Sequence, residues 1–238
     1  MRYACIVASL FVFSSFTTTA NAAAYKEGAV ADGGSVEGKI VYNGPIKTRT
    51  VLPTKDKDVC GGPRKQPLVE VGDGGVVKNA VVFLKEVAAG KAWPKMESNP
   101  VLDNHKCRFE PHVQIVRRGK IDIHNSDPVL HNTHGYYGKR TAFNVALPLQ
   151  DAKVTKLLRT PGEVRVDCDA HGWMLGWIYV VDNPYFALSG DDGTFSIADV
   201  PPGDYTLVVW QEQLGITEIP VSVKAKAAAS VPVELKQN

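Results

Sequence analysis

Hydrophobic residues occur along this chain in short runs that alternate with polar residues, and Gly- and Pro-rich segments separate the runs. Alternation with a period of two is typical of strands whose two faces meet different surroundings. After residue 22, no run has the pattern of a helix of three turns, so we expect an all-β protein. The candidate strands are residues 35–42, 79–87, 112–116, 120–125, 153–158, 163–168, 176–181, 193–197, 204–211 and 217–223.

Composition and charge narrow the class of protein. The chain has 238 residues, of which 44% are hydrophobic and 22% charged. These fractions are ordinary for a packed globular protein, and the length allows one large or two modest domains. The formal net charge is only +2, and basic residues are not interleaved with aromatic ones. We therefore expect no nucleic-acid partner.

Residues 1–22 have the features of a signal peptide. Arg2 supplies a positive start, residues 3–16 are mostly apolar, and Ala-Asn-Ala at residues 20–22 is a small-x-small cleavage site. An uncleaved N-terminal anchor is the alternative. Cleavage predicts a periplasmic or secreted protein, with no membrane span afterwards because no later segment is long and apolar enough.

Export changes what the cysteines imply. Loss of Cys5 leaves Cys60, Cys107 and Cys168. An odd number in an oxidising compartment usually means one disulfide and one thiol with another role. Cys60 lies in a Gly/Pro-rich loop and Cys107 follows a polar run, so we expect a Cys60–Cys107 disulfide. Cys168 lies among metal-ligand residue types and is the expected free thiol.

The segment after Cys168 carries the candidate chemistry. Alternation in residues 163–168 places Val164, Val166 and Cys168 on one face of a strand, so the thiol points inward where the strand ends. The next loop adds His171 and Met174. A thiolate, an imidazole and a thioether, joined by one distant histidine, are the donors of a blue-copper site.

All six histidines lie in the middle of the chain, and a Leu-His-Asn-Thr-His segment can supply the second imidazole. Its two histidines, His131 and His134, are three residues apart and face opposite sides of a regular strand, so both cannot bind one metal. We favour His131 as the ligand and expect His134 at the surface or beside the site. His112 is the candidate for an extra ligand, and His105 and His124 are expected to meet solvent.

Several residues follow one another in a characteristic order across this region: Phe109-x-Pro111, Gly119, Asn125, His131-Asn132, Pro161-Gly162, Cys168, His171 and Met174. The order resembles that of the cupredoxins, the group of plastocyanin, pseudoazurin and amicyanin. The resemblance implies a Greek-key sandwich with one copper ion per chain. It also implies His131, Cys168 and His171 as ligands, with Met174 as a weak axial donor.

The resemblance further implies an electron carrier rather than an enzyme, working with a c-type cytochrome or an exported dehydrogenase. The His171 ring edge, surrounded by Trp173 and Leu175, would be the solvent-exposed electron port. Asp169 departs from the family, and a carboxylate there would alter the hydrogen bonding of the thiolate. One alternative is periplasmic copper binding or delivery without electron shuttling.

The flanking segments resemble a second family. Residues 193–207 match the D-G-x-F-x-I-x-x-V-P-P-G-x-Y-x-L pattern of carboxypeptidase regulatory-like (transthyretin-like) domains, and residues 34–41 match their opening strand. The resemblance implies a discontinuous β-sandwich, 34–95 plus 183–238, with a copper domain inserted at 98–182. Three consecutive β units are the alternative. A carbohydrate- or cell-surface-binding role for the flanks, with an accessory copper domain, also stays open, although Tyr205 and Trp210 fall on opposite faces of one strand.

Overall fold

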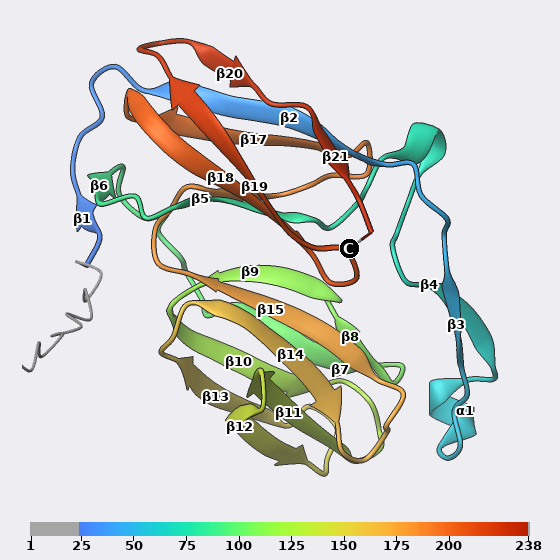
Figure 1. Cartoon of the computed structure of the whole chain (residues 1–238). Helices are drawn as coiled ribbons and strands as arrows, with labels where there is room; N and C mark the ends of the chain where they lie inside the picture. The colour runs from blue at the N-terminus through green and yellow to red at the C-terminus, as the bar shows by residue number, and fades with distance from the viewer. Residues whose placement is uncertain (1–23, 238) are drawn as a thin grey trace, which may run out of the picture.

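The computed structural model describes residues 24–237, and these are almost entirely β-structure (Figure 1). The helical segments of this part are the four-residue α1 (Lys57–Cys60) and the 3-10 turn η1 (Asp73–Gly75). The expectation of an all-β protein is therefore confirmed. None of the helices described is long and apolar enough to cross a membrane. The signal peptide expected at residues 1–22 lies outside the described residues.

The middle of the chain forms a β-sandwich of two sheets, which we call the His-rich sandwich. One sheet has the order β13-β10-β7-β8 and the other has the order β12-β11-β14-β15-β9. Their apolar faces enclose a core that includes Ile121, Val164 and Ile178, all fully buried. The strands are β7 (Val101–His105), β8 (Arg108–Glu110), β9 (Val113–Arg117), β10 (Gly119–Asn125), β11 (His131–Tyr137), β12 (Arg140–Leu147), β13 (Lys153–Leu158), β14 (Gly162–Cys168) and β15 (Leu175–Val181).

Strands from both ends of the described chain form a second sandwich, the flanking sandwich. Its sheets have the orders β16-β5-β18-β19 and β17-β2-β20, and β21 also pairs with β2. A short parallel pair, β1 with β6, lies beside it. The strands are β1 (Lys26–Glu27), β2 (Gly34–Tyr42), β5 (Val81–Lys85), β6 (Ala89–Gly90), β16 (Phe186–Leu188), β17 (Thr194–Val200), β18 (Gly203–Gln211), β19 (Gly215–Val223), β20 (Ala228–Ser230) and β21 (Val233–Leu235).

The two sandwiches contact each other through apolar and polar side chains. Trp210 of the flanking sandwich is buried against Tyr179 of the His-rich sandwich, with ring centroids 5.6 Å apart. The indole Nε1 of Trp210 donates a hydrogen bond to Glu163 Oε2 at 2.7 Å. His112 Nε2 lies 2.8 Å from Glu212 Oε1 in a second polar contact between the sandwiches.

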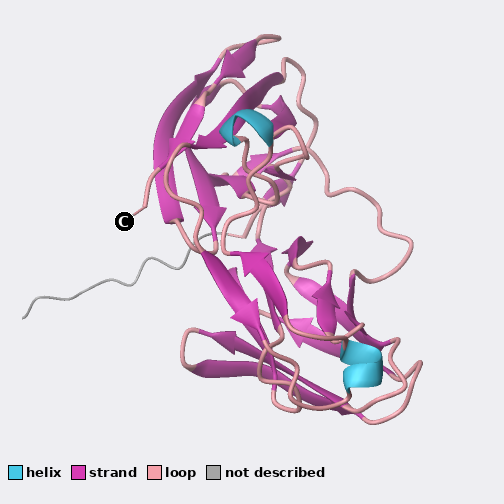
Figure 2. Cartoon of the chain, turned by 90° about the vertical axis from the view of Figure 1, so that its right-hand side faces the viewer, coloured by secondary structure: helices cyan, strands magenta, loops and turns pink. Residues whose placement is uncertain are grey.

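Residues 43–70 leave the end of β2 and extend beside the His-rich sandwich; we call this segment the arm (Figures 1 and 2). It consists of β3 (Thr48–Val51), α1 and the antiparallel partner β4 (Arg64–Pro67). A disulfide joins Cys60 at the end of α1 to Cys107 in the turn between β7 and β8. The predicted pairing is confirmed, and among the cysteines of residues 24–237, Cys168 is the free one.

Each predicted strand overlaps an observed strand, and residues 153–158 coincide with β13. The predicted ranges do not include β1, β3, β4, β6, β7, β8, β12, β16, β20 or β21, and β11 is expected only as the strand that carries His131. β7 ends in Asp103-Asn104-His105, which reads as a polar loop in the sequence. Asn104 is nevertheless fully buried, because its side-chain amide donates to His124 O at 2.7 Å and to Thr133 Oγ1 at 3.0 Å. Hydrogen bonding to distant strands therefore makes a polar residue acceptable inside the sandwich.

Candidate metal centre

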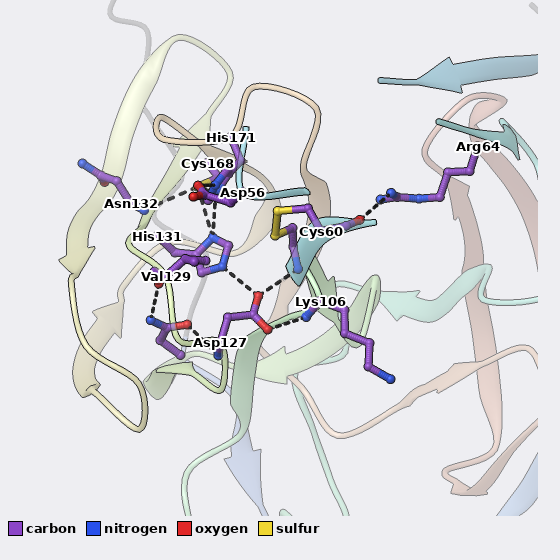
Figure 3. Close-up of a disulfide and its surroundings, with 12 residues drawn as sticks. Asp56, Cys60, Arg64, Lys106, Asp127, Val129, His131, Asn132, Cys168 and His171 are labelled. Atoms are coloured by element: carbon purple, nitrogen blue, oxygen red, sulfur yellow. Dashed lines mark hydrogen bonds and ion pairs between the residues drawn. A yellow bond between two sulfur atoms is a disulfide. The ribbon is translucent and has the colours of Figure 1, made fainter. Parts of the chain in front are cut away.

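Three donor atoms converge at one end of the His-rich sandwich (Figure 3). Nδ1 of His131 lies 3.1 Å from Nδ1 of His171. Sγ of Cys168 lies 3.6 Å from the first of these nitrogens and 3.7 Å from the second. His131 begins β11 and Cys168 ends the antiparallel strand β14, so strand pairing brings them together. The tight turn after Cys168 returns His171 to the same point, with His171 N donating to Cys168 O.

The triangle of donors has the size that one metal ion needs. Bonds of about 2.0–2.3 Å from a single ion to two imidazole nitrogens and a sulfur in a plane place these atoms about 3.5–3.8 Å apart. The observed separations of 3.1, 3.6 and 3.7 Å are close to these values. The three side chains are at most 1% exposed. A soft sulfur with two imidazoles in this arrangement fits copper.

A carboxylate fixes the far nitrogen of each imidazole. His131 Nε2 lies 2.9 Å from Asp127 Oδ2, and His171 Nε2 lies 2.8 Å from Asp56 Oδ2. In each pair Nε2–H donates to the carboxylate, so Nδ1 keeps its lone pair and turns it toward the shared centre. Hydrogen bonds of this kind commonly orient histidines that bind metals.

Asp127 also holds the turn that carries the disulfide. Its carboxylate accepts hydrogen bonds from the backbone N–H groups of Lys106 at 2.7 Å and Cys107 at 2.8 Å. Both residues have a positive φ, of 49° and 52°, which is unfavourable for side chains with a Cβ. Because Asp127 is 2% exposed, these contacts are shielded from water. One buried carboxylate therefore joins the β7–β8 turn to His131.

The arm covers His171. Asp56 precedes α1, and the ring of His171 beneath it has no exposed surface. Both sulfurs of the Cys60–Cys107 disulfide lie within 4.8 Å of a nitrogen of this ring. The expectation that His171 presents a solvent-exposed edge is therefore wrong. The ring is buried because a segment more than one hundred residues upstream packs over the ligand loop, residues 168–174.

The surroundings shift the ionisation of two donors. Burial raises the pKa of the Cys168 thiol, although the backbone N–H of Asn132 donates to Sγ at 3.4 Å and favours the thiolate. Burial also lowers the pKa of His131, and this effect outweighs the hydrogen bond to Asp127. A neutral His131 imidazole is the form that binds metals, and a bound cation favours loss of the thiol proton.

The fourth predicted ligand lies in the same loop. Met174 is 3% exposed and belongs to the apolar cluster that contains Cys168. Its backbone N–H donates to His171 O at 2.9 Å, which closes the turn of the ligand loop. Its role as an axial ligand stays a prediction, as does the complete ligand set.

Two other histidines that sequence analysis considered as ligands, His134 and His112, are not part of the donor triangle. His134 faces the other side of β11, where Nδ1 lies 3.0 Å from Asp169 Oδ2. The Asp169 carboxylate is therefore directed at His134 and not at the thiol. His112 is engaged on both ring nitrogens, by Leu175 O at 3.0 Å and by Glu212.

Sequence reasoning missed both orienting carboxylates. Asp127 carries a weak signal, because it lies four residues before His131 in a short polar turn. Asp56 lies 115 positions from His171 and carries no local signal. Only the packing of the arm reveals its role.

Comparisons with known proteins give partial matches. Residues 173–231 match the family described as polysaccharide lyase family 4, domain II. The chain is 36% identical over 58 residues to "Probable rhamnogalacturonate lyase A" of Aspergillus flavus. The aligned segment covers 24% of this chain and 11% of that protein. The family model found here thus differs from the carboxypeptidase regulatory-like family that the sequence pattern suggested, and that assignment stays a prediction.

Solved structures that resemble part of the chain include an amicyanin, a purple cupredoxin and a copper-containing nitrite reductase. Amicyanin of Paracoccus versutus is 15% identical with a TM-score of 0.33, over 37% of this chain and 85% of that chain. The purple cupredoxin of Nitrosopumilus maritimus is 18% identical with a TM-score of 0.31, over 35% of this chain and 100% of that chain. The copper-containing nitrite reductase of Thermus scotoductus is 18% identical with a TM-score of 0.32, over 39% of this chain and 24% of that chain.

Proposed function

We propose that this chain is an exported mononuclear copper protein that transfers electrons between redox partners. The observation that carries the proposal is the convergence of His131 Nδ1, His171 Nδ1 and Cys168 Sγ within 3.1–3.7 Å. These residues would hold one copper ion, with Met174 as a further axial ligand. Copper, when bound, supplies one-electron redox chemistry, and a Met ligand favours it over zinc.

The chain's own residues support this role by holding the donors in one arrangement. Asp127 and Asp56 fix the two imidazole rings, and Asn132 N–H donates to the sulfur. The donors are buried, so water does not reorganise around them. Little movement is then needed when the charge of the centre changes, which is the requirement for rapid electron transfer.

Copper binding or delivery without electron shuttling is the second candidate. The observation that favours it is the complete burial of His171 beneath the arm, which leaves no exposed ring edge for a redox partner. A carbohydrate-binding role has less support from the side chains, because Trp210 is 3% exposed and bonded to Glu163. The lyase-family match is then its main support.

We further propose that the partner is a c-type cytochrome or an exported dehydrogenase, that the protein works in the periplasm or outside the cell, and that it is not itself an enzyme. The signal-like residues 1–22 support export. The burial of the three donors supports a carrier, since their side chains are at most 1% exposed.

Stopped-flow mixing with a cytochrome tests the electron-transfer role. Copper-loaded protein, reduced with ascorbate and freed of excess reductant, is mixed with ferricytochrome c. We expect one electron to reach the cytochrome for each bound copper, and no transfer from Cys168→Ser treated in the same way. Full copper loading without electron delivery would instead support the binding or delivery role.

A further inference from the structure

A cleft of about 290 Å³ lies between the arm and the His-rich sandwich, next to the candidate metal centre. β3 and β4 of the arm and β8 contribute basic side chains to it. Trp173 and Met174 of the ligand loop line the same cleft. This volume is near the lower end of the range for small-molecule sites. The basic side chains are Arg49, Arg64, Lys65 and Arg108.

The arginines of this cleft lack acidic partners. Across residues 24–237, the arginine that forms an ion pair is Arg165, with Asp167, so Arg49, Arg64 and Arg108 form none. Arg49 donates to the neutral Gln66 Oε1 at 2.9 and 3.2 Å. Arg64 donates to the backbone oxygen of Cys60 at a long 3.4 Å (Figure 3).

The two carboxylates that line the cleft are engaged elsewhere. Glu110 Oε2 lies 3.0 Å from His105 Nδ1, and Glu70 Oε2 accepts a hydrogen bond from Asn79 at 3.0 Å. His112, at the edge of the cleft, is bonded to Glu212. Neither glutamate forms an ion pair with an arginine, and the four basic side chains that line the cleft outnumber the two carboxylates.

The guanidinium groups of Arg49, Arg64 and Arg108 line one cleft, so their like charges act on one another. Partial burial lowers the pKa of Arg64, and the charges of Arg108 and Arg49 lower it further. Like charges held at one site are unfavourable unless an opposite charge offsets them. Guanidinium groups bind carboxylate and phosphate oxygens through paired, charge-assisted hydrogen bonds.

We propose that this cleft is a binding site for a small multivalent oxyanion, a polycarboxylate or a phosphate, held by Arg49, Arg64 and Arg108. The anion would offset the repulsion among the three groups and bridge β3 and β4 of the arm to β8. The three arginines are not part of the donor triangle, so the proposal does not depend on copper binding, although Met174 lines the same cleft.

Isothermal titration calorimetry of the metal-free protein, in a buffer whose only small anion is chloride, tests this site. The probes are citrate and inorganic phosphate, and metal-free protein is used because citrate chelates copper. We expect saturable binding with one site per chain, weakened by added sodium chloride. Binding of one probe but not the other assigns the site to carboxylates or to phosphates.

Arg108→Gln is the informative variant: Arg108 is exposed, so we expect its replacement to leave the fold intact. We expect its affinity for the bound anion to fall about tenfold or more, as loss of a charge-assisted hydrogen bond predicts. Arg159→Gln is the control, since it removes the same charge from an exposed position outside the cleft. Absence of saturable binding by either probe, or equal weakening in both variants, would overturn the proposal.

Discussion

Asp56 and His171 lie 115 positions apart in the chain, yet Asp56 Oδ2 is 2.8 Å from His171 Nε2. The contact places a carboxylate from the arm behind an imidazole whose Nδ1 faces the donor triangle. Asp127 makes the corresponding contact with His131 at 2.9 Å from within the His-rich sandwich. The centre is therefore built from two parts of the chain, and one of them is held in place by the Cys60–Cys107 disulfide.

Replacing the arm carboxylate should change the properties of bound copper. In Asp56→Asn, the negative charge that favours the more highly charged Cu(II) is lost, so the reduction potential should rise. The weaker acceptor should also lower copper affinity by about 10- to 100-fold, as is usual when the partner of a ligating histidine is replaced. Potentiometric titration and competition with a copper chelator measure the two effects.

Asp58→Asn is the matched control for this change. Asp58 lies in α1, is exposed, and carries the same charge close to Asp56 in sequence. It should leave both quantities near their original values. Equal shifts in the two variants would mean that only the net charge of the arm matters, contrary to a specific role for the Asp56–His171 contact.

Loss of the disulfide should destabilise the protein and uncover His171. The bond closes a loop with a sequence separation of 47, for which the chain-entropy relation gives about 4 kcal/mol of stabilisation. Urea unfolding of the Cys60→Ala/Cys107→Ala protein measures the loss of free energy. Modification of histidines by diethyl pyrocarbonate, read at His171 by mass spectrometry, measures its exposure.

Reduced protein of the original sequence serves as the comparison, because it breaks the bond while keeping both cysteine side chains. It should lose stability by a similar amount. Unchanged protection of His171 in both forms would show that the arm stays in place without the disulfide.

The contact of His112 with Glu212 should make stability depend on pH. Burial disfavours the charged imidazole, but the hydrogen bond and charge of Glu212 outweigh it and raise the pKa of His112 above its usual value of 6.5. The stabilisation is therefore fully present below about pH 6.5 and is lost as the pH rises through the folded-state pKa.

His112→Gln should remove this dependence. Its free energy of unfolding should fall below that of the original protein at low pH, and the difference should shrink as the pH rises. His105→Gln, which breaks the exposed His105–Glu110 pair, is the control and should have little effect. A difference that grows with pH in His112→Gln would contradict this account of the contact.

Local patterns predicted much of the fold and the centre of the site. Alternation in residues 163–168 placed Val164, Val166 and Cys168 on the inner face, and all three are buried. The same argument separated His131 from His134, which face opposite sides of β11. Period-two side-chain geometry is a property of the backbone itself, so it can be read without knowledge of distant contacts.

Features that depend on distant packing could not be predicted in this way. β7 reads as a loop because the residues that satisfy Asn104 lie on other strands. The arm residue Asp56 is exposed in part and has the appearance of an ordinary surface carboxylate. Its position over His171 follows from the disulfide and from the course of the arm, which no periodicity encodes.

The most direct test of the central claim is the absorption and electron paramagnetic resonance spectrum of the Cu(II)-loaded protein, recorded beside Cys168→Ser. We predict an intense thiolate-to-copper charge-transfer band in the original protein and its loss in the variant. Absence of the band, or a band that the substitution leaves unchanged, would contradict a copper centre built on His131, Cys168 and His171.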